Sequence, residues 1–341
     1  METYDLHEAS RSGLLPKLPP EVLTRERLVA RNAAGNTPLH AIAKYGGLRL
    51  VPAGLLTADT LSLRNDSGYT PLHHAALGGH LDEVPPALLT APLLGTCSNS
   101  GYTVFHVAAA NGHLDQLPAA LVTPAILLSR THLGNTLLHE AAESGTLDRL
   151  PAGFLTAAHL LERNLGGETV LHVAAFNGHL NQLPPTLLTA AALREATTAG
   201  DTVLHAAAIS GHLGQVPAGL LTHDNLVIAS QTGFTVIHAA AETGQLSQIP
   251  RERLTADLLL IRNDNGDTPL HAAAFEGHLD QVPAALFTAE LLNARNYEGI
   301  SVGRLAVQGG FAGQIPAGLR PKTPGAVRRL LTRLGMSRSP F

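Results

Sequence analysis

The sequence predicts an all-α solenoid of stacked helical repeats, and three recurring residues carry that prediction. A histidine recurs every 33 residues, in the series His7, His40, His73, His106, His139, His172, His205, His238 and His271. A glycine recurs at the same period from Gly13 to Gly310, and a proline follows each of these glycines six residues later. A fixed period of this size indicates stacked units that contact only their neighbours.

The composition excludes several other classes of protein. Hydrophobic residues make up 45% of the 341 residues, which is ample for a folded chain. Cys97 is the only cysteine, so the sequence holds neither a disulfide framework nor a thiolate metal cluster. No apolar run approaches the ~18 residues of a membrane-spanning helix, and the polar start of the chain is unlike a signal peptide. We therefore expect a cytoplasmic protein.

The first half of each repeat has the pattern of a helix with defined ends. In the ninth copy, Thr268 is a helix N-cap, and Pro269 stands at the first helical position, where its missing N–H costs nothing. Leu270 and the alanines that follow face inward, and their small size lets neighbouring repeats approach closely. Gly277 ends the helix, because a left-handed residue is most readily a glycine.

The second half of each repeat predicts two short helical segments. Pro283 cannot lie inside a helix, so it begins a short one over residues 283–286. Thr288 caps a further turn over residues 289–292, and a polar loop at 295–298 leads to the next glycine.

The motif Gly-x-Thr-Pro-Leu-His-x-Ala-Ala-x-x-Gly-His at this period resembles the ankyrin repeat. The resemblance covers essentially residues 1–319, and residues 35–46, 68–80 and 266–278 carry it best. In the second half, Leu-x-x-Val-Pro-x-x-Leu-Leu-Thr-x-x-x-Leu-Leu replaces the usual long second helix and Gly-Ala-Asp hairpin finger. We therefore expect an ankyrin-type helical repeat solenoid of about ten 33-residue repeats, with short extra helices in place of the hairpin fingers.

The first and last copies depart from the pattern, as expected of the caps of a solenoid. Beyond them, residues 320–341 hold six basic residues and no acidic one, which leaves −10 on residues 1–319. Within this tail we expect a helix over residues 324–334. Its apolar stripe follows helical spacing and consists of Val327, Leu330, Leu331 and Leu334. Such a helix could cap the last repeat, lie on a membrane or contact nucleic acid.

The eighteen histidines do not form a metal site in this arrangement. Equivalent residues of neighbouring repeats lie about 8–10 Å apart, whereas zinc needs its ligand atoms at about 2 Å. Catalytic motifs are missing as well, since neither His7-Glu8 nor His139-Glu140 has the second histidine of a zinc protease helix. We therefore expect no enzymatic activity, metal, cofactor or small-molecule substrate.

The candidates for binding are residues that vary from repeat to repeat while the recurring threonine, histidine, glycine and proline stay constant. They stand just before the capping threonine and near the end of the first helix, positions that line the concave, partner-binding face in the family that this chain resembles. Aromatic residues dominate the energetics of interfaces. Six of the thirteen aromatic residues fall at these positions: Tyr45, Tyr69, Tyr102, Phe176, Phe234 and Phe275. The alternative is that some of them pack against the loop of the next repeat.

These observations predict a monomeric, non-catalytic scaffold that binds another protein along its concave face. The rival interpretation is a tethering protein that binds a membrane or nucleic acid through the basic tail. The negative array favours a protein partner with a basic or mixed surface.

Overall fold

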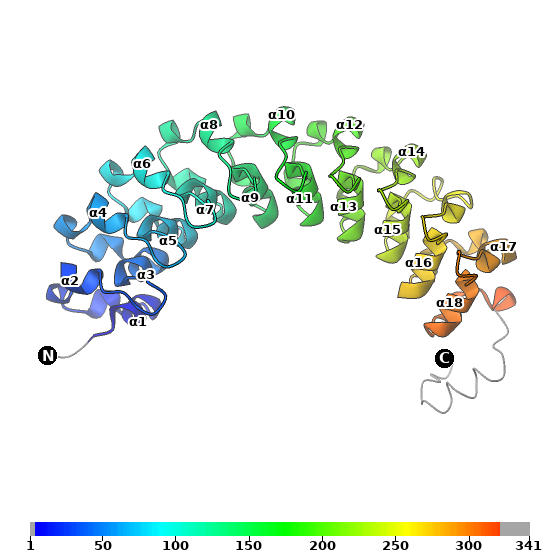
Figure 1. Ribbon diagram of the computed structural model, residues 1–341, viewed down its shortest axis with the longest axis horizontal. Helices are drawn as coiled ribbons and strands as arrows, with labels where there is room; N and C mark the ends of the chain where they lie inside the picture. Colours follow the sequence, from blue (N-terminus) through cyan, green and yellow to red (C-terminus); the bar gives the residue numbers. More distant parts are fainter. Residues whose placement is uncertain (1–3, 321–341) are drawn as a thin grey trace, which may run out of the picture. The chain divides into compact units, whose positions relative to one another are not determined.

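The structure, a computed structural model, describes residues 4–320. Contacts within the chain define two compact units, which meet in the sequence at Leu183 and Pro184 and are described here one at a time. In each unit the long helices of successive repeats lie side by side in one layer, and shorter helical segments form a second layer (Figure 1). Between residues 4 and 320 the β structure is limited to isolated bridges, so the predicted all-α repeat class is confirmed.

The N-terminal unit contains six long helices that contact their neighbours in order. They are α1 (Leu6–Arg11), α3 (Pro38–Tyr45), α5 (Pro71–Gly78), α7 (Val104–Asn111), α9 (Leu137–Ser144) and α11 (Val170–Phe176). The short α-helices of this unit are α2 (Arg25–Leu28), α4 (Ala58–Leu61), α6 (Ala91–Leu94), α8 (Pro124–Leu127) and α10 (Ala157–Leu160).

The C-terminal unit repeats the arrangement with four long helices between residues 184 and 320. These are α13 (Val203–Ile209), α15 (Val236–Glu242), α16 (Pro269–Glu276) and α18 (Val302–Gln308). Its short α-helices are α12 (Ala190–Leu193), α14 (His223–Leu226) and α17 (Ala289–Asn293).

The predicted caps set the start of each long helix. In α5 the side chain of Thr70 accepts a hydrogen bond from the backbone N–H of His73, and Pro71 occupies the first helical position. The imidazole of His73 returns the bond, because its Nδ1 accepts the backbone N–H of Thr70 at 3.1 Å. This is a capping box in which histidine takes the place of the usual Glu or Gln.

The same histidine also joins one repeat to the next. Because Nδ1 is the acceptor, the hydrogen lies on Nε2, and Nε2 of His73 donates it to the carbonyl oxygen of Tyr102 at 3.0 Å. Further bridges of this kind join His40 to Tyr69, His139 to Glu168, His205 to Phe234, His238 to Asp267 and His271 to Ile300. In these repeats one ring fixes both a helix start and a contact between repeats, whereas Nε2 of His106 meets the carbonyl oxygen of Ser129 in its own repeat at 3.0 Å.

A narrow core of leucine and alanine separates the two layers. Leu72, Ala75 and Ala76 of α5 are completely buried, as are Leu81 in the segment that follows and Leu61 of the preceding short helix. The alanines add little volume, so consecutive long helices can pack closely, which is what the sequence predicts.

Two 3-10 turns follow nearly every long helix, and they replace a second long helix. Those of the N-terminal unit are η1 (Leu15–Lys17), η2 (Pro20–Val22), η3 (Leu48–Leu50), η4 (Ala53–Leu55), η5 (Leu81–Glu83), η6 (Pro86–Leu88), η7 (Leu114–Gln116), η8 (Ala119–Leu121), η9 (Leu147–Arg149), η10 (Ala152–Phe154) and η11 (Leu180–Gln182). Those of the C-terminal unit are η12 (Pro185–Leu187), η13 (Leu213–Gln215), η14 (Ala218–Leu220), η15 (Leu246–Gln248), η16 (Leu258–Leu260), η17 (Leu279–Gln281), η18 (Ala284–Leu286), η19 (Ala312–Gln314) and η20 (Ala317–Leu319). The segment at 250–260 departs from its neighbours, with plain turns and then η16 where a short α-helix is expected.

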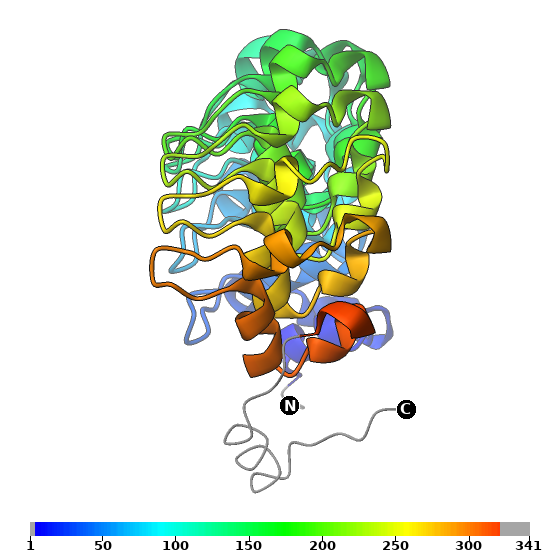
Figure 2. The ribbon, with the colours of Figure 1, turned by 90° about the vertical axis from the view of Figure 1, so that its right-hand side faces the viewer.

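The loops between repeats correct one expectation, that short helices stand in place of the hairpin fingers. The short helices are present, but the fingers are present as well. In the finger at residues 65–69, the N–H of Asn65 donates to the carbonyl oxygen of Tyr69 at 2.9 Å, and Gly68 turns the chain with φ of 79°. Neighbouring fingers are also linked, since the N–H of Asp66 donates to the carbonyl oxygen of Ala34 at 3.2 Å. In each unit the fingers project side by side (Figure 2). The expectation was wrong because these backbone bonds close a finger without the Gly-Ala-Asp sequence.

The close approach of α3 and α5 gives a stability prediction. A Cβ atom on Gly78 would clash with the carbonyl oxygen of Lys44, and backbone cannot move aside as a side chain can. We expect Gly78→Ala to lower the free energy of unfolding by about 1–3 kcal/mol through overpacking, measured by urea denaturation followed by circular dichroism. Gly54→Ala is the matched control, because no atom lies within 4 Å of its added Cβ. Equal stability of the two variants would contradict the prediction.

The buried histidines predict an acid-sensitive fold. Burial lowers the pKa of His40, His73 and His106 to about 4, from 6.5 for an exposed histidine. The unfolded chain therefore binds more protons than the folded chain between about pH 6.5 and pH 4, so stability falls as the pH falls through this window. We expect the urea midpoint to decline between pH 7 and about pH 5, before most carboxylates are protonated. A constant midpoint over that range would show that the rings are not held neutral.

Candidate partner-binding surface

The open side of the long-helix layer carries one variable position of each repeat, near the C-terminal end of its long helix. We call the surface formed by these positions the helix-end face. In the N-terminal unit it consists of Lys44, Leu77, Ala110, Glu143 and Phe176, and in the C-terminal unit of Ile209, Glu242 and Phe275. Each of these helices ends at this position or one residue beyond it.

Large apolar side chains are exposed along this face in both units. Leu77 is 42% exposed and Phe176 is 55% exposed in the N-terminal unit. In the C-terminal unit, Ile209 is 44% exposed and Phe275 is 68% exposed. Tyr45, in the position next to Lys44, is 44% exposed. Exposed apolar groups that recur at one repeat position are not required by the core and form a surface suited to binding.

Three of the six aromatic residues predicted to bind a partner instead pack partly against other residues of the repeats. Tyr69, Tyr102 and Phe234 precede the capping threonines and are half-buried. Their rings lie against histidines of the same repeat, with centroid distances of 5.1 Å for Tyr69–His73 and 5.3 Å for Phe234–His238. Each of the three also accepts, at its backbone carbonyl, the histidine bridge from the preceding repeat. Packing therefore accounts for much of their surface.

A buried carboxyl group that the sequence analysis did not single out holds Tyr102. Glu140 is only 4% exposed, and its Oε1 accepts a hydrogen bond from Nδ2 of Asn135 at 3.0 Å. Burial raises the pKa of Glu140, and burial beside Glu140 raises the pKa of the Tyr102 phenol. The sequence does contain a sign of this interaction, because Glu140 stands at a repeat position that mostly holds alanine or valine in other repeats.

Each unit has a hollow next to its helix-end face. In the N-terminal unit Tyr45 and Lys44 line a hollow of about 310 Å³ together with Glu8 and Arg11. In the C-terminal unit a hollow of about 350 Å³ is lined by both Phe234 and Phe275. The structure thus brings two of the predicted residues together at one site.

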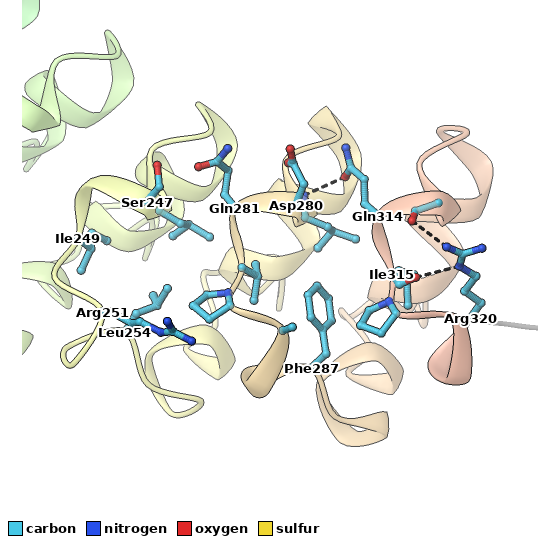
Figure 3. A pocket seen from close by; sticks show the side chains of 17 residues that line it. Ser247, Ile249, Arg251, Leu254, Asp280, Gln281, Phe287, Gln314, Ile315 and Arg320 are labelled. Atoms are coloured by element: carbon cyan, nitrogen blue, oxygen red, sulfur yellow. Dashed lines mark hydrogen bonds between the residues drawn. The ribbon is translucent and has the colours of Figure 1, made fainter. Parts of the chain in front are cut away.

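A larger groove lies elsewhere on the C-terminal unit, between the second halves of its last described repeats. It has a volume of about 700 Å³, and Phe287 lies between Arg251 and Arg320 (Figure 3). The guanidinium of Arg320 donates to the carbonyl oxygens of Ile315 at 2.9 Å and Gly313 at 3.0 Å. The chain continues from this point into the basic tail, so the helix expected over residues 324–334 lies outside the described residues.

Neither metal ligation nor a membrane span is apparent in the part of the chain that the structure describes. No three side chains of His, Cys, Asp or Glu converge on a point between residues 4 and 320. The helices in that range all lack the length and hydrophobicity needed to cross a bilayer. In the bridging histidines both ring nitrogens are already hydrogen-bonded, which leaves no lone pair for a metal.

The fold and its open surface define a helical repeat protein of the binding type. A family model for three ankyrin repeats matches residues 53–122, and a model for a single ankyrin repeat matches residues 265–297. The chain therefore contains ankyrin repeats in both units. Ankyrin repeats are generally protein–protein interaction modules, and the family is typically non-catalytic. No curated protein was found to match the sequence.

The difference between packed and open aromatic residues can be measured. We expect Tyr102→Ala to lower the free energy of unfolding by about 1–2 kcal/mol, because it removes a half-buried ring and leaves Glu140 without its hydroxyl partner. Phe275→Ala removes a ring that is 68% exposed, so the change should stay within about 0.5 kcal/mol. Urea denaturation of the two variants beside the wild type checks this. A larger decrease in the free energy of unfolding for Phe275→Ala would show that its ring packs against other residues of the repeats.

Proposed function

We propose that this protein is a non-catalytic scaffold that binds another protein through its helix-end face. The observation that carries the proposal is the exposure of Leu77, Phe176, Ile209 and Phe275, all at one repeat position. Burial of apolar groups is the dominant favourable contribution to most protein–protein association. At the same position the frame also accepts alanine, lysine and glutamate, so the apolar residues there are not needed for folding.

The rigidity of the frame supports the same function. Each long helix has hydrogen-bonded caps, and histidine bridges tie neighbouring repeats together within each unit. A surface held in place before binding loses little conformational entropy when the partner arrives. The single thiol, Cys97, is exposed and unpaired, which suits a reducing compartment and supports a cytoplasmic location.

Affinity capture with a matched control tests the scaffold. The test variant replaces Leu77, Phe176, Ile209 and Phe275 with alanine. The control replaces Leu133 and Leu165 with serine, because these leucines are 66% and 77% exposed on fingers, away from the helix-end face. Each immobilised protein is exposed to cytosolic extract of the source organism, and the retained proteins are quantified by mass spectrometry.

We expect a discrete protein to be retained by the wild type and the control, and its recovery to fall about tenfold or more with the test variant. Recovery of the same protein by all three would show that the helix-end face is not the binding surface. Circular dichroism of the variants checks that each remains folded.

A further inference from the structure

The hollow of the C-terminal unit has walls of two kinds, aromatic and acidic. Its volume is about 350 Å³, and its lining comes from α15, α16, α18 and the three fingers that precede them. Phe275 stands open on one side, and Phe234 packs against His238. Ile300 and Leu305 complete an apolar base.

Carboxylates supply all the charge in this hollow. Four of them line it, namely Glu242, Asp267, Glu276 and Glu298, and neither lysine nor arginine is among the lining residues. The two histidines of the lining belong to the frame, and burial lowers the pKa of both His238 and His271. At neutral pH the hollow is therefore strongly negative.

No basic side chain of the lining balances this negative charge. Asp267 accepts a hydrogen bond from Nδ2 of Asn296 at 2.8 Å. Within residues 4–320, Glu242, Glu276 and Glu298 form no ion pair. Burial and the nearby charge of Glu276 raise the pKa of Glu242. The hollow thus lacks a cation.

The N-terminal unit shows how the chain itself fills the equivalent place. In that hollow Arg11, Lys44 and Tyr45 stand at the repeat positions of Glu242, Phe275 and Glu276. There the Lys44 ammonium lies 5.4 Å from the centre of the Tyr45 ring, and Arg11 pairs with Glu8 at 2.6 Å. That hollow supplies its own cations to its aromatic ring and carboxylates.

We propose that the hollow of the C-terminal unit binds an arginine side chain of the partner protein. This inference rests on the scaffold function proposed above and specifies the chemistry of its partner. A guanidinium is planar, so it can stack on the exposed face of Phe275 while its N–H groups pair with the carboxylates of Glu242 and Glu276. The same carboxylates repel phosphate, so an anionic lipid or nucleic acid would not occupy this hollow.

Methyl NMR with a small arginine derivative tests the site directly. The probe is N-acetylarginine methylamide, and the matched probe is N-acetylcitrulline methylamide, which has nearly the same shape without the charge. The methyl groups of Ile300 and Leu305 line the hollow and report binding. We expect saturable shifts of both methyls with the arginine derivative, and about tenfold weaker binding of the citrulline derivative.

A pair of single variants separates the site from general electrostatic attraction. Glu276→Gln should weaken binding of the arginine derivative about fivefold or more, because it removes one of the pairing carboxylates. Glu290→Gln removes the same charge from α17, on a residue that does not line the hollow, and should leave the affinity unchanged. Equal affinity for citrulline, shifts confined to other methyls, or equal effects of the two variants would overturn the proposal.

These outcomes are independent of the capture experiment. If the helix-end variant loses its partner but the arginine derivative does not bind, the scaffold function stands and the arginine site is wrong. The opposite outcome is that the arginine derivative binds as expected while the helix-end variant recovers as much of the captured protein as the wild type. In that case the hollow is a cation site and the proposed scaffold surface is wrong.

Discussion

The repeat structure depends on one interaction, the hydrogen bonds of a neutral histidine with two pieces of backbone. In the third repeat, Nδ1 of His73 accepts from Thr70 and Nε2 donates to Tyr102 of the next repeat. The first bond fixes the start of a helix, and the second fixes the spacing between helices. Protonation would put a hydrogen on Nδ1, where an acceptor is needed, so the ring must stay neutral for both bonds to persist.

Because the histidine fixes the helix starts and the contacts between repeats, residues at other repeat positions can vary without changing the fold. At the helix-end position, the second to sixth repeats of the N-terminal unit hold Lys44, Leu77, Ala110, Glu143 and Phe176 in turn, and all five helices begin at a capping threonine. Side chains of quite different chemistry are therefore compatible with the same helix. The binding surface can therefore be separated from the fold residue by residue, which is the property that a display scaffold requires.

Most of the fold follows from local sequence signals. Capping threonines, prolines and glycines act within one turn of helix, so the long and short helices could be predicted from their spacing. The fingers could not, because hydrogen bonds between backbone groups close them, and many sequences permit such bonds. The loss of the short helix at 250–260 is equally hidden, since Pro250 and Thr255 both keep their places there.

The site was predictable in position but not in detail. Repeat spacing identifies the variable positions, yet exposure depends on what each ring meets in the next repeat. Tyr102 meets the buried Glu140, whereas Phe275 meets open space, and no local pattern distinguishes the two. Leu77 and Ile209 escape notice because aliphatic residues in a helix ordinarily indicate core. Their exposure becomes visible only when the helices are placed side by side.

Charge and apolar surface make different contributions to recognition on such a frame. The apolar residues of the helix-end face can bind many partners, since burial of apolar area is not directional. Glu242 and Glu276 repel each other in a shared hollow, so a cation is favoured there and an anion is excluded. Apolar contact then supplies affinity while the unbalanced carboxylates select among partners. Arg11 and Tyr45 hold the corresponding two positions in the N-terminal unit, so selectivity can be altered by substitutions that leave the caps and bridges intact.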